Sequence, residues 1–174
     1  MSDGKTVADV MIGIFEYPHV PYWVTIRQTV KVVRASFLGA KKYPDPLAIL
    51  VFDEKYNLMG ILTLRDILKG LEPRFLKAPP DSIQLAVEDE SALTLIWDTL
   101  FKTESKELSE RQVSEVMTPA KYFVEPSEPV TKAAYLMLHH DLLLLPVLEN
   151  KRKLLGLVRM IEIFDTISDA VIKE

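Results

Sequence analysis

Runs of apolar residues follow the same order in both halves of the chain. In the first half, apolar runs at 47–52 and 58–62 flank a short turn-forming segment. In the second half, runs at 143–148 and 154–158 flank a similar segment. Two such runs joined by a short polar turn are typical of a β-hairpin. We therefore predict one hairpin in each half of the chain.

A helix is predicted on either side of each hairpin. Apolar residues at helical spacing precede the hairpins, namely Val30, Val33, Phe37 and Leu38 in the first half and Val130, Ala133, Ala134, Met137 and Leu138 in the second. Ser127 is the expected N-cap of the second of these helices. Short extended segments at 23–26 and 122–125 precede them, and short helices at 65–69 and 160–167 follow the hairpins. Each half thus has the predicted order βαββα.

The two halves also share residues at matching positions, which identifies them as repeats. Val10-Met11 matches Val116-Met117, and Gly60-Ile61-Leu62 matches Gly156-Leu157-Val158. A βαββα unit of this size has too little core to be stable alone, so we expect the sheets of the two copies to pack together. The predicted fold class is α/β, with two pseudo-symmetric repeats.

We predict three segments: a first repeat at 1–71, an insert at 72–111 and a second repeat at 112–174. Within the insert, apolar residues form a stripe at helical spacing: Leu93, Ile96, Trp97, Leu100 and Phe101. Such a stripe predicts an amphipathic helix. It either packs on the module's own core or across a dimer interface, or it is a docking face for a partner or a lid that responds to ligand.

The repeated residues resemble a tandem pair of cystathionine-β-synthase-like (CBS) domains, known as a Bateman module. The resemblance is carried by Val10-Met11, Val116-Met117-Thr118-Pro119, Leu145-Pro146-Val147 and Gly60-Ile61-Leu62-Thr63-Leu64-Arg65-Asp66-Ile67-Leu68. It covers roughly 6–70 and 112–168. It implies a non-catalytic, often dimeric regulatory module that binds an adenine nucleotide (AMP, ADP or ATP) or S-adenosylmethionine in clefts between the repeats, without a covalent cofactor.

Two functions fit this resemblance. The first is a ligand sensor, in which an adenosine-containing molecule shifts the arrangement of the repeats and the change passes to a homodimer or to an effector protein. The alternative is a structural homodimerisation or protein-interaction module whose ligand sites have degenerated. An enzyme is not expected, because no catalytic motif is present.

Composition narrows the choice of partners and compartment. The chain has 174 residues, of which 48% are hydrophobic and 26% are charged, as in a soluble globular protein. It has no cysteine, which excludes disulfides and thiolate metal sites. Its longest apolar run, 142–148, is far shorter than the roughly 20 residues that span a bilayer. The net charge is -4, whereas proteins that bind nucleic acid typically carry an excess of basic residues. We expect a cytoplasmic protein without membrane or nucleic-acid partners.

Thr63 and Asp66 stand where the second strand of the first hairpin gives way to a helix. Their spacing is that of a helix-capping pair, with Thr63 as N-cap and Asp66 three residues later. The resemblance implies a second role, in which Asp66 accepts hydrogen bonds from both ribose hydroxyls while Thr63 and the helix N-terminus face phosphate. Capping and ligand binding are compatible.

Arg159 and Glu162 replace this pair in the second repeat. Glu162 reaches one methylene further than Asp66 and is still able to accept from a diol. The planar fork of Arg159 suits a phosphate, and it suits equally a salt bridge to Glu162. Either this half-site favours a more anionic ligand or it has lost binding.

An apolar slot for adenine is expected beside these polar groups. The resemblance places it at Tyr22 and Val24 in the first repeat, and at Tyr122, Val124 and Pro146 in the second. Both tyrosines suit stacking on a base or packing in the core, whereas Trp23 and Phe123 are expected in the core. Lys121 is either a phosphate contact or a solvated lysine. His139 and His140 lack further nearby ligands, so no metal site is expected there.

Overall fold

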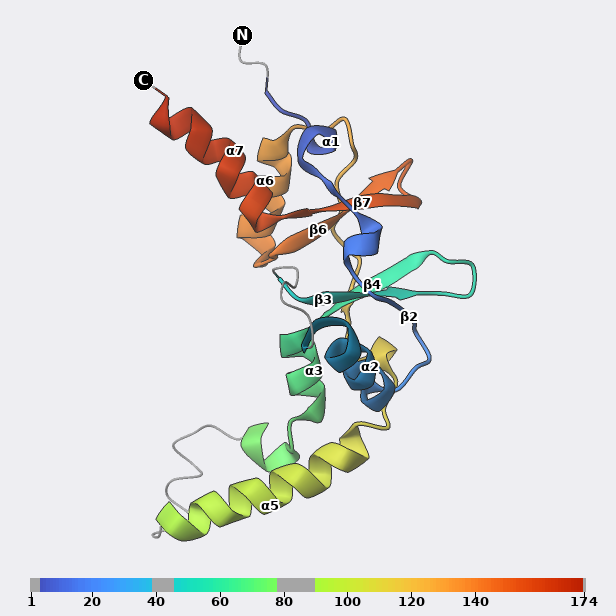
Figure 1. Ribbon diagram of the computed structural model, residues 1–174, viewed down its shortest axis with the longest axis vertical. Helices are drawn as coiled ribbons and strands as arrows, with labels where there is room; N and C mark the ends of the chain where they lie inside the picture. Colours follow the sequence, from blue (N-terminus) through green and yellow to red (C-terminus); the bar gives the residue numbers. More distant parts are fainter. Residues whose placement is uncertain (1–3, 39–45, 78–89, 174) are drawn as a thin grey trace.

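The computed structural model describes residues 4–38, 46–77 and 90–173. Two β-sheets lie one above the other in the middle of an elongated molecule, and helices cover their outer faces (Figure 1). The helix of the insert lies furthest from the centre, at the end opposite the chain termini (Figure 1). Within the described ranges, no helix is long and apolar enough to cross a bilayer.

The first sheet has the strand order β2-β3-β4-β5. Its strands are β2 (His19–Pro21), β3 (Ala48–Phe52), β4 (Leu58–Thr63) and β5 (Thr118–Pro119). The helical segments associated with it are α2 (Ile26–Val33), its π-helical continuation (Arg34–Leu38) and α3 (Leu64–Leu71). Strands β3 and β4 form the predicted antiparallel hairpin, and β2 pairs with β3 in parallel.

The second sheet has the order β1-β7-β6. Its strands are β1 (Ile12–Gly13), β6 (Leu144–Glu149) and β7 (Lys153–Arg159). The helices associated with it are α1 (Val7–Val10), α6 (Val130–His140) and α7 (Met160–Ile172). Short 3₁₀ turns lie at Ile14–Glu16, Arg74–Lys77 and Val113–Glu115. Strands β6 and β7 form the second predicted hairpin.

Each sheet borrows a short strand from the other half of the chain. Strand β1, near the N-terminus, pairs with β7, so that Gly13 lies opposite Gly156. Strand β5, near the start of the second repeat, pairs with β4, so that Pro119 lies opposite Gly60. This exchange ties the two repeats together and brings residues after β5 beside α3.

The buried core joins the two sheets, as predicted. One cluster lies within each repeat, and a third consists of Tyr17, Ala48, Leu50, Phe52, Ile61, Leu144 and Leu157 from both sheets. All five residues of β3 are buried. Because β3 is buried along its whole length, the first sheet is covered on both faces at this strand.

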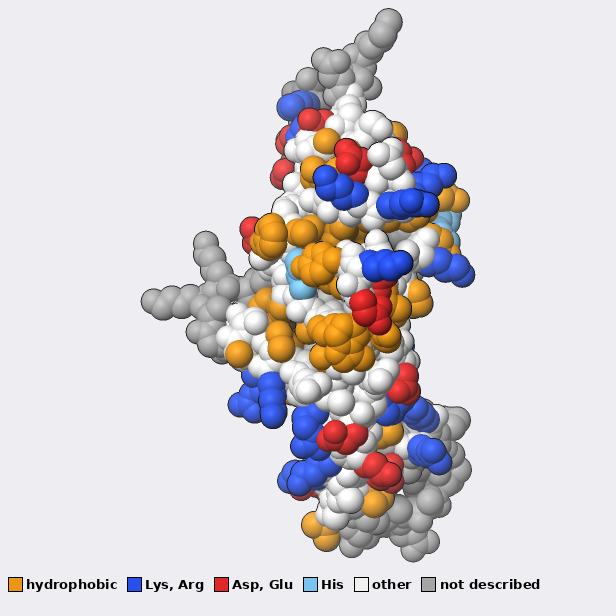
Figure 2. Space-filling view, turned by 90° about the vertical axis from the view of Figure 1, so that its right-hand side faces the viewer, with side chains coloured by type: hydrophobic (Ala, Val, Ile, Leu, Met, Phe, Trp, Pro, Cys, Tyr) orange, Lys and Arg blue, Asp and Glu red, His pale blue; other side chains and the backbone are white. Residues whose placement is uncertain are grey.

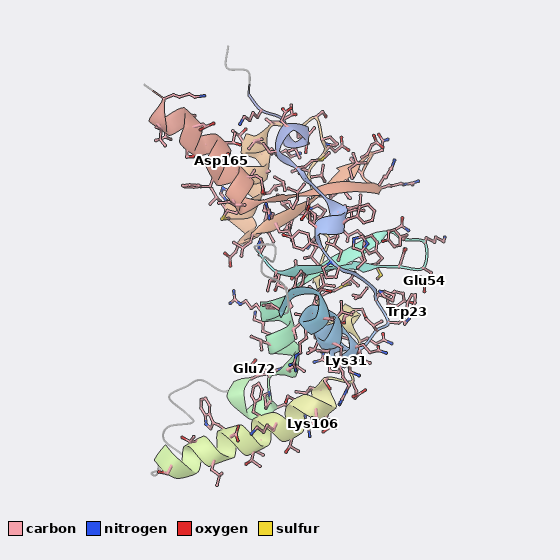
Figure 3. All side chains as sticks on the ribbon, viewed as in Figure 1. Trp23, Lys31, Glu54, Glu72, Lys106 and Asp165 are labelled. Atoms are coloured by element: carbon pink, nitrogen blue, oxygen red, sulfur yellow. The ribbon has the colours of Figure 1, made fainter. Side chains whose placement is uncertain are left out.

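Three local predictions were wrong. Trp23 is 47% exposed rather than packed in the core, and Figure 3 shows it on the side of the molecule that carries Glu54 and the hairpin turn. Hydrophobic side chains gather in the middle of this face (Figure 2). The segment 23–26 is not a strand, because Thr25 already caps α2. Helix α6 begins after Pro129 rather than after Ser127, because a residue before proline is disfavoured in helical conformation.

The insert contains the predicted helix, α5 (Glu90–Leu108). Its C-terminal end is anchored to the start of α2: the Arg27 N–H donates to the Ser109 carbonyl, and the Arg27 guanidinium donates to the Lys106 carbonyl and pairs with Glu110. Trp97, Leu100 and Phe101 are each more than a third exposed. Leu93 and Ile96 of the stripe have side chains outside the described set. The described part of the stripe is therefore not buried within this chain.

Candidate functional site

A cleft of about 910 Å³ lies where the two repeats meet. Its first wall is the start of α3, its second is the segment 118–122 that contains β5, and its third is the segment 140–146 that leads from α6 into β6. Because β5 is the exchanged strand, the cleft depends on both halves of the chain.

Thr63 and Asp66 line the cleft and form the predicted capping box at the N-terminus of α3. The Thr63 N–H and hydroxyl both donate to Oδ2 of Asp66 at 2.8 Å, and the Asp66 N–H donates to the Thr63 hydroxyl at 3.2 Å. Within the described part of the chain, no group donates to Oδ1 of Asp66. One carboxylate oxygen of Asp66 is therefore available to a hydroxyl group in the cleft.

Basic side chains surround this helix start. Arg65 and Lys69 extend from α3, and Lys121 follows β5; all three line the cleft and are exposed. The acidic residues of the lining are Asp66 and Asp141. Together with the free N–H groups at the start of α3, the three basic side chains can bind an anion such as phosphate.

The rest of the lining is mainly apolar. It includes Leu47, Ile61, Leu144 and Pro146, from strands and adjoining segments of both repeats. At one edge the ring of Tyr122 stacks on that of His140, with 3.7 Å between ring centroids and 16° between ring planes. A cleft of this kind, with apolar walls and an aromatic ring at the edge, can hold a flat ring system.

The matching position in the second repeat is occupied by an ion pair. Arg159 and Glu162, 21% and 18% exposed, form a bidentate salt bridge at the N-terminus of α7. Nε of Arg159 lies 2.9 and 3.1 Å from Oε1 and Oε2, and a terminal guanidinium nitrogen also donates to Oε1. The backbone N–H of Arg159 donates to Oε2 at 3.0 Å. The hydrogen bond to Glu162 raises the pKa of Arg159 above its ordinary value.

The remaining predicted site residues lie outside the cleft. The Tyr22 hydroxyl donates to Oε1 of Glu54 at 2.8 Å, and this bond raises the pKa of Tyr22. Val24 packs against the core of the first repeat, and Val124 is fully buried in that of the second. Of the nine predicted residues, the cleft brings together Thr63, Asp66, Tyr122 and Pro146.

Among the lining residues that sequence reasoning did not assign to the site, four have ionisable side chains: Arg65, Lys69, His140 and Asp141. A signal existed for the first two, because Arg65 and Lys69 are four residues apart on either side of Asp66 and so share a helix face. No such signal existed for His140 and Asp141. They lie at the C-terminal end of α6, where Asp141 is the C-cap residue and has a left-handed backbone conformation. Among the described residues, no group of three or more His, Cys, Asp or Glu is placed to hold a metal ion.

Known proteins share this fold. Residues 113–169 match the family described as CBS domain. The CBS-pair protein CBSX2 from Arabidopsis thaliana has a TM-score of 0.65 at 18% identity, over 98% of this chain and 99% of that chain. The structure of CBSX2 in complex with AMP has a TM-score of 0.60 at 20% identity, over 97% of this chain and 99% of that chain. The cytosolic domain of the Mg²⁺ channel MgtE in complex with ATP has a TM-score of 0.57 at 21% identity, over 95% of this chain and 48% of that chain.

At these identities the similarity shows the fold, which is that of a CBS pair. Among curated proteins, none matches this chain in sequence.

Proposed function

Since the chain carries a CBS domain at 113–169 and has the fold of a CBS pair throughout, we propose that it is a non-catalytic regulatory module that binds an adenosine-containing ligand. The ligand occupies the cleft at the start of α3. One observation carries the proposal: a single cleft contains a carboxylate with one oxygen available, three basic side chains and apolar walls from both repeats. Two proteins of similar fold are known in complex with AMP and ATP.

Asp66 is the proposed ribose contact. Its Oδ2 is held by Thr63, which fixes the orientation of the carboxylate, while Oδ1 faces no protein donor among the described residues. A ribose hydroxyl that donates to Oδ1 satisfies this oxygen without breaking the capping box. The helix start therefore does not have to rearrange when the ligand binds, which lowers the cost of binding.

Arg65, Lys69 and Lys121 are the proposed phosphate contacts. Three basic groups against two acidic ones favour an anionic ligand. S-adenosylmethionine carries a sulfonium cation near its ribose, where a phosphate would otherwise stand. Charge complementarity at this position thus favours AMP, ADP or ATP over S-adenosylmethionine.

The base is proposed to lie between the apolar walls, near Tyr122 and Pro146. Tyr122 presents one ring face to His140, so the base either uses the other face or displaces the histidine ring, which is exposed. Offset stacking between aromatic rings contributes about 0.5–1.5 kcal/mol beyond the buried area.

A thermal-shift panel with AMP, ADP, ATP and S-adenosylmethionine tests the proposal. A ligand that binds only the folded state raises the melting temperature in proportion to the logarithm of its concentration. We expect at least one adenine nucleotide to raise it in this way and S-adenosylmethionine to raise it less. No shift with any of the four, in the presence and absence of Mg²⁺, would contradict ligand binding.

Homodimerisation is the second candidate function, and a regular stripe on α7 favours it. Ile161, Phe164 and Ile167 are 55%, 67% and 42% exposed, and their spacing places them along one side of the helix. Exposed apolar stripes of this kind mark protein interfaces, and a second copy of the chain presents a matching stripe. Sedimentation equilibrium should show a dimer that Phe164→Asp weakens; a monomer at all concentrations would contradict it.

A further inference from the structure

The two repeats place equivalent residues at the starts of α3 and α7. Strand register fixes the correspondence, because Gly60 and Gly156 both face an exchanged strand. Counting forward from these glycines, Arg159 stands where the first repeat has Thr63, and Glu162 stands where it has Asp66. The two helix starts can therefore be compared residue by residue.

The carboxylates of Asp66 and Glu162 differ in how many of their oxygens accept a hydrogen bond from the protein. Only Oδ2 of Asp66 accepts hydrogen bonds within the described chain. Both oxygens of Glu162 accept from Arg159, which contributes its backbone N–H and its guanidinium group. A ribose at the second helix start would have to displace a bidentate, largely shielded ion pair. Removing one partner of such a pair leaves the other charge poorly compensated.

The surrounding charges differ as well. On α3, Arg65 and Lys69 line the cleft. The equivalent positions on α7 are Ile161 and Asp165, the latter on the outer part of the molecule in Figure 3. A carboxylate at 165 repels a phosphate where Lys69 would attract it. This difference is independent of the ion pair and disfavours the same ligand.

We propose that the chain binds one nucleotide, in the cleft at α3, and that the Arg159–Glu162 pair permanently takes the place of ligand in the second half-site. This inference rests on the proposed function. Both helix starts are capped from within the chain, but only that of α3 keeps a carboxylate oxygen without a hydrogen bond from the described residues, and only that one responds to nucleotide. Only the arrangement around α3 then depends on the concentration of nucleotide.

Isothermal titration calorimetry with ATP tests the inference through stoichiometry. We expect one ATP per chain for the wild type. Asp66→Asn and Glu162→Gln are matched substitutions at equivalent positions, and each retains a side chain able to cap. Asp66→Asn should weaken ATP binding by about tenfold or more, because a hydrogen bond to a charged acceptor is lost. Glu162→Gln should leave affinity within about twofold and stoichiometry at one.

Each contrary result has a distinct meaning. Two ATP per chain, or weaker binding in Glu162→Gln, overturns the single-site inference while the proposed function stands. Unchanged binding in Asp66→Asn, with circular dichroism like that of the wild type, removes the ribose contact proposed for Asp66 and with it the single site at α3, while nucleotide binding by the chain stands. No ATP binding by the wild type removes the proposed function and this inference with it.

Discussion

Gly60 lies so close to Thr118 that a Cβ atom on the glycine would stand 2.7 Å from the Thr118 carbonyl oxygen. Gly156 has the same relationship to Ile12, at 2.5 Å. In both repeats the glycine lets an exchanged strand approach the hairpin. The shared glycine of the two copies is thus explained by backbone contact between the repeats, and the cleft depends on this contact.

Gly60→Ala should therefore destabilise the protein. The added methyl group meets a backbone oxygen, which cannot move aside as a flexible side chain can. Overpacking of this kind costs about 1–3 kcal/mol, measured as the free energy of unfolding in urea. Gly13→Ala is the matched control, because nothing lies within 4 Å of a Cβ at Gly13. Equal stability of the two variants would contradict the role given to Gly60.

Thr63→Ala should lower stability by about 1 kcal/mol, because the Asp66 N–H loses its side-chain cap. Thr63→Ser keeps the hydroxyl and should recover most of this loss. Urea denaturation of both variants measures the difference. Comparable losses in the two would mean that the methyl group, rather than the hydroxyl, accounts for the stability.

The pH dependence of stability should include a contribution from Asp53. Hydrogen bonds from the Asn57 side chain and backbone lower the pKa of Asp53 below 3.8, with a smaller contribution from Lys55. The folded state thus favours the ionised carboxylate, and this stabilisation is present above pH 3.8 and is lost as the pH falls through the lower folded pKa. Melting temperatures of wild type and Asp53→Ala should converge in acid. A gap that stays constant down to pH 2 would contradict this.

Arg65→Ala and Lys69→Ala should weaken ATP binding by several-fold and AMP binding by less, because the ligand with more phosphates makes more contacts with the basic side chains. Both residues are exposed, so rising ionic strength should reduce the difference. Lys31→Ala, on α2 and outside the cleft (Figure 3), is the control in fluorescence titrations. Equal losses for AMP and ATP would contradict phosphate contact.

The order of elements and the Thr63–Asp66 capping box could be predicted from the sequence, because both depend on local spacing. The strand exchange could not, because β1 and β5 have two residues each and leave no periodic pattern. The site was only partly predicted for the same reason. Lys121 and Tyr122 reach α3 through the exchanged strand, whereas Val124, only two residues further, is drawn into the core of the second repeat.

The contacts made by the side chains at the start of α7 could likewise not be predicted from the sequence. Spacing allowed Arg159 to pair with Glu162 or to bind a phosphate, and it could not choose between them. The choice depends on three-dimensional geometry, in which the guanidinium lies against both carboxylate oxygens. Trp23 was expected in the core, but it is 47% exposed, because the sequence alone does not distinguish a core aromatic residue from one at the surface.

The central claim is that ligand binds at Asp66, and a pair of capping variants tests it most directly. At α1, outside the cleft, the N–H and hydroxyl of Thr6 donate to Oδ2 of Asp9, as those of Thr63 donate to Oδ2 of Asp66. The measurement is the dissociation constant of ATP for Asp66→Ala and Asp9→Ala by calorimetry. We predict a loss of tenfold or more for Asp66→Ala and wild-type affinity for Asp9→Ala. Wild-type affinity in both variants, or an equal loss in both, would contradict the assignment of the site.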